Sequence, residues 1–450
     1  MPLSVKRHLY VGKTFGTSLY LAGMQRLLLL LFCFPFFALA QPKTDAFLAN
    51  LLKKDTSRLL QQVITDPAQY RVQIIYTQID RDKKNNPSFH HYYFNVDPAL
   101  YFNPASMVKL PLAALALEKL DSLKDKGIDR NTAMLFDSSY EGQQKAVADT
   151  TAQTGLPSIA HYIRRAFLIS ENDPYNRMYQ FIGQQTINRK LHQKGYNQSR
   201  ILRQFMGFSQ EQNRHTNGIR FINKNGGTLY YQPPAYNPDS FALSTILLGK
   251  GHWNNKDSLI NQQFDFTAHN NLPLKDFQQI LQSIIFPASV PPKQRFAISE
   301  DNRHFLLQYL SQFTSETPYP YYDTSLFYDT YVKFFFRDST RHLPEGVRVF
   351  NKVGWSYGFL TDVSYVADFK NNIEYMLAAT LYVNSDGILN DGKYEYKEIG
   401  YPFLYQLGQD IYQYELTRKR TIKPNLSALK ITYEKRDPQD KRKPVRDVDN

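Results

Sequence analysis

Two short runs in which at least half of the residues are apolar lie near the N-terminal end of the chain. Residues 70–80 and 90–97 are rich in β-branched and aromatic side chains, and the polar segment 81–88 lies between them. This pattern predicts two strands joined as a hairpin. Ahead of them, residues 44–65 carry apolar side chains at helical spacing, which predicts an amphipathic helix.

Helical spacing returns in the middle of the chain. Residues 158–168, 174–194, 274–286 and 299–313 each show it, and we expect a helix in each segment. Residues 213–270 differ, because they are rich in Asn, Gly, Tyr and Pro and have only weak periodicity. We interpret this segment as an insertion of irregular structure.

Strand patterns reappear towards the C-terminal end, after an aromatic stretch at 318–336. Residues 346–354, 361–369 and 373–383 predict consecutive strands, and a final helix is expected at about 395–416. Strands near both ends with helices between them predict an α/β (α+β) sandwich. In this fold the N- and C-terminal strands form one antiparallel sheet beside an all-helical lobe.

The composition is that of a globular protein, with 42% hydrophobic and 21% charged residues. The net charge of +13 lies mainly at the two ends, since residues 1–40 carry +4 and residues 418–450 carry +6. Residues 41–417 are therefore nearly neutral, which argues against a nucleic-acid partner. The terminal segment 418–450 is highly charged and poor in apolar residues, and we expect a basic disordered tail there.

Residues 24–40 read MQRLLLLLFCFPFFALA, with Arg26 before an apolar run that ends in Ala-Leu-Ala. This is typical of a secretory signal peptide, and we expect cleavage after Ala40. The run is shorter than the roughly 20 residues that a spanning helix needs. We therefore expect a periplasmic or secreted protein with no stable membrane span and a single domain over residues 41–417. Cys33 is the only cysteine, so the mature chain would have no disulfide and no thiol nucleophile.

The stretch 101-YFNPASMVKLPLAALALEKL-120 raises a chemical question. Ser106 and Lys109 are three residues apart, which in a helix places their side chains on one face. A serine hydroxyl is a weak nucleophile until a base removes its proton. Lysine can be that base only when it is neutral, which requires burial or a neighbouring cation. Pro111 removes one backbone donor, so we expect the segment to be irregular or well supported by packing.

The S-x-x-K pair alone is also explained by an ordinary amphipathic helix. A second copy, Ser427 and Lys430, lies in the predicted tail, where no site is expected. Two other motifs change the interpretation. Residues 170–172 read S-E-N and residues 352–354 read K-V-G. Taken singly, a turn cluster or a strand-end lysine explains each of them as well.

In this order, the motifs S-x-x-K, S-x-N and K-x-G resemble those of the penicillin-recognising serine hydrolases, which include the class A β-lactamases. The resemblance implies a Ser106 acyl-enzyme, with Lys109 as base or proton relay and Ser170 as proton donor to the leaving nitrogen. It also implies an oxyanion hole of the backbone N–H groups of Ser106 and Trp355. The residues expected to bind the substrate are Asn172, Lys352, Gly354 and Trp355.

The family resemblance also defines the expected partners. It implies β-lactam or D-Ala-type peptide amides as substrates, a monomer, and neither a cofactor nor a metal. Gly354 would let the substrate backbone pair with an exposed strand edge, and Lys352 would supply a fixed positive charge. The adjacent His90 and His91 point to opposite faces of a predicted strand, and we interpret both as surface residues rather than metal ligands.

The chain departs from the family pattern at three places. Glu171 stands where aspartate is usual, and Val353 replaces a hydroxyl residue for which Ser356 or Thr361 would have to compensate. The glutamate that assists deacylation has no clear counterpart, because Glu211 is the only acid in residues 205–221.

We therefore expect a secreted serine acyl-hydrolase that resembles class A β-lactamases and acts on β-lactam amides through a Ser106 acyl-enzyme. Two alternatives stay open. One is a DD-peptidase-like penicillin-binding protein, which a persistent acyl-enzyme would suit. The other is a non-catalytic envelope-binding protein on the same scaffold.

Overall fold

The computed structural model describes residues 43–205 and 207–448 of the protein. The predicted signal peptide and its cleavage site lie outside the described residues. The described residues belong to one compact unit. In the described part of the chain, no helix is both long enough and apolar enough to cross a membrane.

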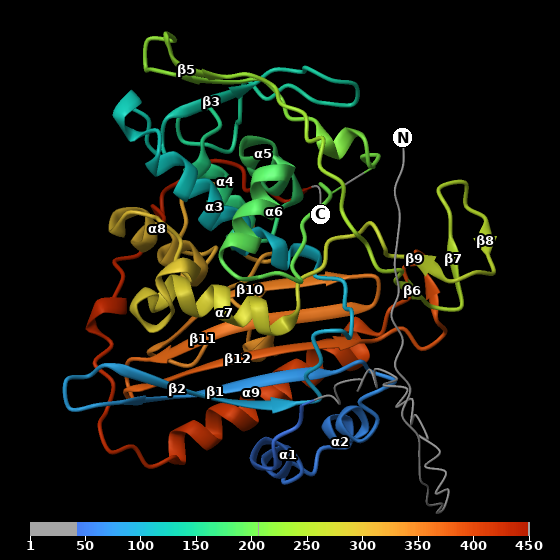
Figure 1. The fold of residues 1–450 in the computed structure, drawn as a ribbon. Helices are drawn as coiled ribbons and strands as arrows, with labels where there is room; N and C mark the ends of the chain where they lie inside the picture. The colour runs from blue at the N-terminus through green and yellow to red at the C-terminus, as the bar shows by residue number, and fades with distance from the viewer. Residues whose placement is uncertain (1–42, 206, 449–450) are drawn as a thin grey trace, which may run out of the picture. The chain divides into compact units, whose positions relative to one another are not determined.

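A five-stranded antiparallel sheet forms the centre of this unit (Figure 1). Its strands, in spatial order, are β10 (Val347–Ser356), β11 (Phe359–Asp368), β12 (Ile373–Tyr382), β1 (Gln73–Arg81) and β2 (Pro87–Phe94). The first strand of the chain pairs with the last, since Ile75 on β1 lies opposite Ala378 on β12. The predicted sheet of N- and C-terminal strands is confirmed, and β10 is an edge strand.

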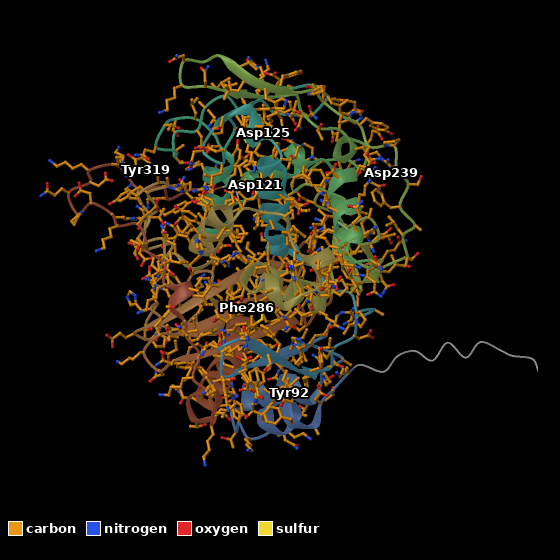
Figure 2. The ribbon with its side chains drawn as sticks, turned by 60° about the vertical axis from the view of Figure 1, so that its left-hand side comes forward. Tyr92, Asp121, Asp125, Asp239, Phe286 and Tyr319 are labelled. Atoms are coloured by element: carbon orange, nitrogen blue, oxygen red, sulfur yellow. The ribbon has the colours of Figure 1, made fainter. Side chains whose placement is uncertain are left out.

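Helices cover both faces of the sheet (Figure 1). α7 (Leu274–Ile285) packs on β11 and α8 (Glu300–Ser311) packs on β10. α1 (Ala46–Leu52), α2 (Arg58–Thr65) and α9 (Tyr401–Thr417) belong to the other face. Strand side chains alternate between the faces, so Phe350 joins the core under the helical lobe and Val353 joins the core under α9. Phe286, which is labelled in Figure 2, follows α7. Its ring contacts Phe89 and Tyr365 of the sheet.

The helical lobe surrounds α3 (Lys109–Asp121) and contains α4 (Ile159–Leu168), α5 (Asn172–Ile182) and α6 (Gln184–Gln193). Nearly every side chain of α3 is buried, because its sequence is apolar on all sides. A 3₁₀ turn, Ala105–Val108, precedes α3. The expected irregularity is therefore present. Pro111 lies in the first turn of α3, where a missing N–H costs little.

Three predicted helices have different boundaries. Residues 44–65 form α1 and α2, separated by a polar link, and Ser57 caps α2. Residues 174–194 form α5 and α6, which are divided at Gly183, whose φ is +86°. Residues 396–400 form a π turn before α9 begins. In each case a local break interrupts a continuous apolar pattern, and the pattern alone does not show the break.

The segment 213–270 is more regular than expected. β4 (Ile219–Ile222) and β5 (Thr228–Gln232) form a hairpin that pairs with β3 (Ala133–Phe136). The turn between β4 and β5 contains Asn-Gly-Gly, which is a hairpin signal. The shorter strands that complete the small sheets are β6 (Leu247–Leu248), β7 (Gly251–Trp253), β8 (Leu259–Ile260), β9 (Phe264–Asp265) and β13 (Ile388–Leu389). The interpretation as irregular structure is therefore wrong for β4 and β5.

The expectation of a disordered tail is wrong for residues 418–448. Leu426 and Leu429 are buried in the core, and the Tyr433 hydroxyl lies 2.8 Å from Ser311 Oγ on α8. The Val445 N–H donates to the Tyr321 carbonyl at 2.7 Å. A few well-spaced apolar and aromatic side chains thus hold a charged segment against the body. Ser427 and Lys430, the second S-x-x-K pair, are both exposed.

Candidate active site

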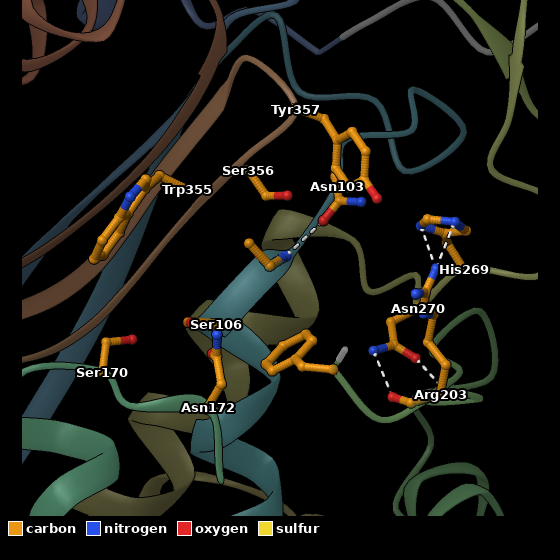
Figure 3. A pocket seen from close by; sticks show the side chains of 12 residues that line it. Asn103, Ser106, Ser170, Asn172, Arg203, His269, Asn270, Trp355, Ser356 and Tyr357 are labelled. Atoms are coloured by element: carbon orange, nitrogen blue, oxygen red, sulfur yellow. Dashed lines mark hydrogen bonds between the residues drawn. The ribbon is translucent and has the colours of Figure 1, made fainter. Parts of the chain in front are cut away.

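Three distant segments meet between the helical lobe and β10. Ser106 lies on the 3₁₀ turn before α3, Ser170 lies directly before α5, and Lys352 lies on β10. Lys109 Nζ is 2.7 Å from Ser106 Oγ and 3.4 Å from Ser170 Oγ. Lys352 Nζ is 2.8 Å from Ser170 Oγ. The predicted constellation of two hydroxyls and two amines is therefore present in the structure. Figure 3 shows the two serines in the pocket that they line.

Lys109 is placed to act as a base. Its side chain is fully buried, and its Nζ contacts the Ser170 carbonyl oxygen and lies 2.9 Å from Asn172 Oδ1. Burial and the nearby Lys352 hold the pKa of Lys109 well below its usual value. A neutral amine has two N–H groups and one lone pair. It can donate to Ser170 and Asn172 while it accepts the proton of Ser106.

Three non-glycine residues in and around this group of side chains have a positive backbone φ angle. Ala105, directly before the nucleophile, has φ +44°, Ser170 has φ +72°, and Tyr357 in the pocket wall has φ +53°. Non-glycine residues with positive φ are uncommon and gather at functional sites. The surrounding packing thus holds both hydroxyl groups in place at a cost in backbone energy.

Lys352 is less simple than a fixed positive charge. Its Nζ donates to the Val353 carbonyl at 2.7 Å in addition to contacting Ser170. Burial lowers the pKa of Lys352 to about 7, while Asp362 opposes this shift. The charge of Lys352 therefore titrates near neutral pH, which corrects the expectation of a permanent cation.

A buried polar network lies on the opposite face of the sheet, under α9. Lys333 Nζ donates to Asn351 Oδ1 at 2.6 Å, and Asn351 Nδ2 donates to Asp362 Oδ1 at 2.9 Å. The Phe334 N–H donates to Asp362 Oδ2 at 2.9 Å. Burial raises the pKa of Asp362 to about 6 and lowers that of Lys333 to about 7. Asp362 belonged to the recognised motif, whereas nothing in the sequence indicated Lys333.

We expect Asp362→Asn to lower the free energy of unfolding by about 3 kcal/mol at pH 7, because removing one partner leaves Lys333 buried and uncompensated. The double variant Asp362→Asn/Lys333→Met should recover most of this loss. Urea denaturation of both variants measures the two values. Equal losses in the single and double variants would contradict electrostatic coupling between the two residues.

The same network predicts how stability depends on pH. The pKa of Lys333 is about 7 in the folded protein and ~10.4 in an unfolded chain. Between these values only the unfolded state keeps the proton, so this group makes the free energy of unfolding rise with pH. Asp362 acts in the opposite direction between pH ~4 and its folded value of about 6.

Gly354 and Trp355 hold the strand against the nucleophile turn. A Cβ at Gly354 would lie 2.5 Å from the Pro104 carbonyl oxygen and 3.0 Å from the Met107 nitrogen. Gly354 is thus required for close packing of β10, rather than for an open edge at this position. The Trp355 indole packs edge-on against Tyr331 and Phe334, and the oxyanion role of its backbone N–H stays a prediction.

The proposed replacements for the missing hydroxyl at Val353 lie in different places. Val353 is buried in the core on the α9 face. Ser356 lines the pocket, whereas the buried Thr361 hydroxyl donates to Thr380 Oγ1 at 2.8 Å. Ser356 is therefore the one of the two candidates that can contact a substrate.

The pocket at Ser106 has a volume of about 350 Å³. The described residues that line it are Asn103, Ala105, Ser106, Ser170, Asn172, Arg203, Phe205, His269, Asn270, Trp355, Ser356 and Tyr357. Sequence reasoning missed Asn103, Arg203, Phe205, His269, Asn270 and Tyr357. Phe205 is the first residue of the segment 205–221, in which the deacylating glutamate was sought, and Arg203 lies two residues before it, but no motif marked either residue.

An aromatic ring lies near the base, and no carboxylate lines the pocket among the described residues. The centroid of the Phe205 ring is 5.3 Å from Lys109 Nζ, and the ring stacks on Tyr175. Asn176 clamps the backbone of Phe205 by accepting from its N–H at 2.8 Å and donating to its carbonyl at 3.0 Å. Glu211 is exposed and lies beside His215 at 3.2 Å, away from the pocket lining.

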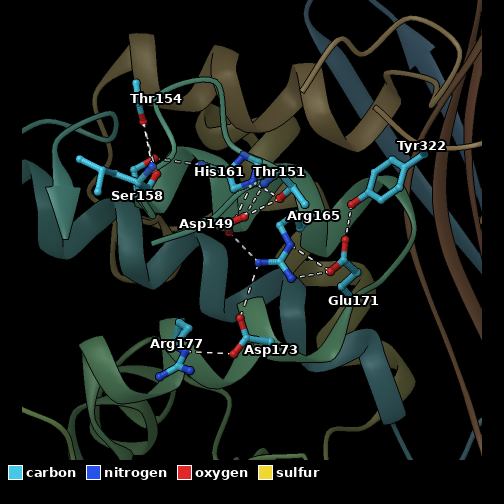
Figure 4. Close-up of polar contacts among 11 residues, drawn as sticks. Asp149, Thr151, Thr154, Ser158, His161, Arg165, Glu171, Asp173, Arg177 and Tyr322 are labelled. Carbon is cyan, nitrogen blue, oxygen red and sulfur yellow. Dashed lines mark hydrogen bonds and ion pairs between the residues drawn. The ribbon is translucent and has the colours of Figure 1, made fainter. Parts of the chain in front are cut away.

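Glu171 belongs to a buried ion cluster beside the pocket (Figure 4). Its carboxylate lies 2.6 Å from Arg165 Nη2 and also accepts a hydrogen bond from the Tyr322 hydroxyl. Arg165 Nη1 in turn lies 2.8 Å from Asp149 Oδ2. Glu171 therefore anchors the turn that carries Ser170 and links it to the aromatic stretch 318–336.

The interpretation of both histidines as surface residues is wrong for His91. Its Nδ1 lies 2.9 Å from Thr77 Oγ1 and 3.0 Å from Gln278 Nε2, so it joins the sheet to α7. His90 is exposed, as expected. The described residues contain no cluster of three or more His, Cys, Asp or Glu side chains that could hold a metal ion.

Comparisons with known proteins agree with the motifs. The family model Beta-lactamase2, described as the beta-lactamase enzyme family, matches residues 53–225. This range contains the S-x-x-K and S-x-N motifs but not Lys352. No curated protein matches the chain.

Several solved structures align with most of the chain at low sequence identity and with TM-scores below 0.5. An ancestral class A β-lactamase is 12% identical, with 81% of this chain and 99% of that chain covered and a TM-score of 0.45. A structure described as PBP-A is 13% identical, with 83% and 98% covered and a TM-score of 0.44. A β-lactamase from Burkholderia ambifaria is 13% identical, with 82% and 99% covered and a TM-score of 0.43.

Likenesses of this size do not decide the function, which has to be inferred from the site. Residues 53–225 match the β-lactamase enzyme family, and the resemblance of this chain to the penicillin-recognising serine hydrolases is thereby confirmed.

Proposed function

We propose that the protein is a serine acyl-transfer enzyme that forms an acyl-enzyme at Ser106 with β-lactams and D-Ala-type peptide amides. One observation carries this proposal: the buried Lys109 amine lies 2.7 Å from Ser106 Oγ, and the Ser170 hydroxyl lies within reach of both lysines. A nucleophile, its base and a proton relay to a leaving group are the parts that acyl transfer requires.

The proposed reaction follows from these contacts. Ser106 Oγ forms a bond to the substrate carbonyl carbon while its proton passes to Lys109 Nζ. As the C–N bond breaks, the nitrogen takes the proton of Ser170, and Lys109 returns its proton to the Ser170 oxygen. The net result is an ester at Ser106, a protonated leaving nitrogen and a neutral lysine. Asn172 is placed to donate its amide N–H to a substrate carbonyl.

We propose that the acyl-enzyme persists, as in the DD-peptidase-like alternative. Phe205 lies over Lys109, and no carboxylate lines the described pocket to orient a water molecule. Hydrolysis of the ester needs a base beside the attacking water. Slow hydrolysis would leave time for another acceptor to take the acyl group.

The proposal is tested by intact-mass spectrometry after incubation with benzylpenicillin. We expect the protein to gain the whole mass of the drug, because a lactam nitrogen stays attached after ring opening. The modified peptide should contain Ser106. Absence of any adduct would overturn the proposal and favour a non-catalytic binding protein.

Nitrocefin separates slow from efficient hydrolysis. We expect a burst of about one equivalent per protein molecule, followed by slow turnover, because the acyl-enzyme accumulates. Rapid hydrolysis without a burst would contradict the persistent acyl-enzyme and favour an efficient β-lactamase.

We also propose that the enzyme acts outside the cytoplasm, in the periplasm or as a secreted protein. This proposal depends on the charged and apolar pattern of residues 24–40. N-terminal sequencing of the mature protein checks it, and we expect the first residue to be Gln41.

A further inference from the structure

Arg203 lies at the end of the pocket that the proposed reaction leaves unexplained. Figure 3 shows Arg203, His269 and Asn270 on one side of Ser106 and Ser170 on the other. Ser170 marks the end where the leaving nitrogen is protonated. Arg203 therefore faces the acyl side of the substrate, on the other side of the reacting carbonyl from the leaving nitrogen.

The guanidinium of Arg203 is held in place by the protein. Its Nη1 lies 2.7 Å from His269 Nε2. Burial, together with Arg203 itself, lowers the pKa of His269 to about 3, so the ring is neutral and its Nε2 accepts this hydrogen bond. Asn270 holds the backbone of the same residue. The Arg203 backbone N–H donates to Asn270 Oδ1 at 3.0 Å, and Asn270 Nδ2 donates to the Arg203 backbone carbonyl at 3.2 Å.

Aromatic rings fix the orientation of His269. Its ring packs edge-on against Phe264, Phe266 and Tyr357, with centroid distances between 4.9 and 5.8 Å. A histidine ring that is packed in this way presents one nitrogen to Arg203 in a fixed direction. The cation is thus preorganised before any ligand arrives, which reduces the entropy cost of binding.

Arg203 has no acidic partner among the described residues. Its guanidinium contacts are with the His269 ring and the Gln204 carbonyl. The described lining of the Ser106 pocket contains no Asp or Glu, and Arg203 is the one residue of this lining with a permanent charge. Lys109 and Lys352 lie behind the serines and have lowered pKa values. Arg203 also lines two adjoining cavities that contain Asp257, Asp391 and Asp265, but it forms no ion pair with these acids among the described residues, so its guanidinium is available to a carboxylate of the ligand.

We propose that Arg203 binds a carboxylate on the acyl part of the substrate, the part that is transferred to Ser106. This inference rests on the proposed function and names its substrate class: amides or lactams whose acyl group is itself acidic. Arginine suits this role because its planar guanidinium pairs with both oxygens of a carboxylate.

Carbenicillin and benzylpenicillin provide a matched test, because they differ only by a carboxylate on the acyl side chain. We expect carbenicillin to acylate the wild-type protein about tenfold faster, the effect of one charged hydrogen-bonded pair. Arg203→Met should remove this preference, so that the two drugs acylate the variant at similar rates. Arg203→Lys should retain part of it. Arg200→Met, which neutralises a nearby arginine outside the pocket lining, should leave the ratio unchanged.

A ratio that Arg203→Met leaves unchanged would overturn the inference while the proposed function stands. Failure of both drugs to form an adduct would overturn the proposed function. The inference is then judged by non-covalent binding of the same pair to Ser106→Ala protein, measured by calorimetry. Tighter binding of carbenicillin that is lost with Arg203→Met supports it, and equal binding of both drugs overturns it.

Discussion

Ser106→Ala should abolish covalent labelling by a fluorescent penicillin. The ester in the proposed reaction forms at Ser106 Oγ, and without that oxygen the Lys109 amine has no nucleophile to activate. Lys109 and the hydrogen bonds that hold it to Ser170 and Asn172 remain in this variant. The expected result is therefore loss of chemistry without loss of the fold, measured by fluorescence of the denatured protein on a gel.

The second S-x-x-K copy offers a control with the same local sequence. Ser427→Ala changes an exposed serine three residues before Lys430, and labelling should stay at the wild-type level. Thermal unfolding of both variants shows whether each is folded. Labelling that survives in folded Ser106→Ala protein would refute the assigned nucleophile and direct attention to Ser170, the other hydroxyl near Lys109.

Lys109→Met should slow acylation of Ser106 by about 10²–10⁴-fold, the usual contribution of a positioned general base. Methionine fills much of the buried volume of lysine but cannot accept a proton. Lys352 does not substitute, because its Nζ contacts Ser170 and the Val353 carbonyl rather than Ser106. Stopped-flow measurement of acylation by a fluorescent penicillin gives the rate.

The pH profile separates a base from a packing residue. Acylation should rise with pH as Lys109 loses its proton and should reach its plateau well below pH 10.5, because burial and Lys352 lower the pKa of Lys109. The Lys109→Met variant should lack this rise. Lys119→Met is a matched control, since Lys119 lies on the same helix with a pKa lowered to about 8 but outside the pocket lining. A Lys109→Met rate within tenfold of the wild type would contradict the role of base.

Two strands of the main sheet were predicted more closely than the helix expected at residues 174–194. The runs at 361–369 and 373–383 became β11 and β12 with ends shifted by at most two residues. Short β-branched runs bounded by turns leave few alternatives. The apolar pattern of 174–194 continued across a break at Gly183, because α5 and α6 both bury a face in the lobe. The positive φ of that glycine is a property of the folded chain.

The residues of the candidate site also fall into two groups, those that a motif identified and those that no motif identified. Ser106, Lys109, Ser170, Asn172 and Lys352 were identified from three motifs, because each motif is a local spacing that its own helix, turn or strand presents in one direction. Arg203, Phe205 and Lys333 belong to no motif. Their importance comes from contacts with residues far away in the chain: His269 for Arg203, Asn176 for Phe205 and Asn351 for Lys333.

Residue spacing and side-chain type were enough to predict the strands of the main sheet, most of the helices and the motif residues of the acyl-transfer site, since both are local properties. Which groups are buried together became evident only in the folded protein. The tertiary structure lowered the pKa values of Lys109 and Lys352, placed Phe205 over the base and left Arg203 without an acidic partner in the described pocket. Burial and long-range contacts set charge and access, and neither can be read from neighbours in the chain.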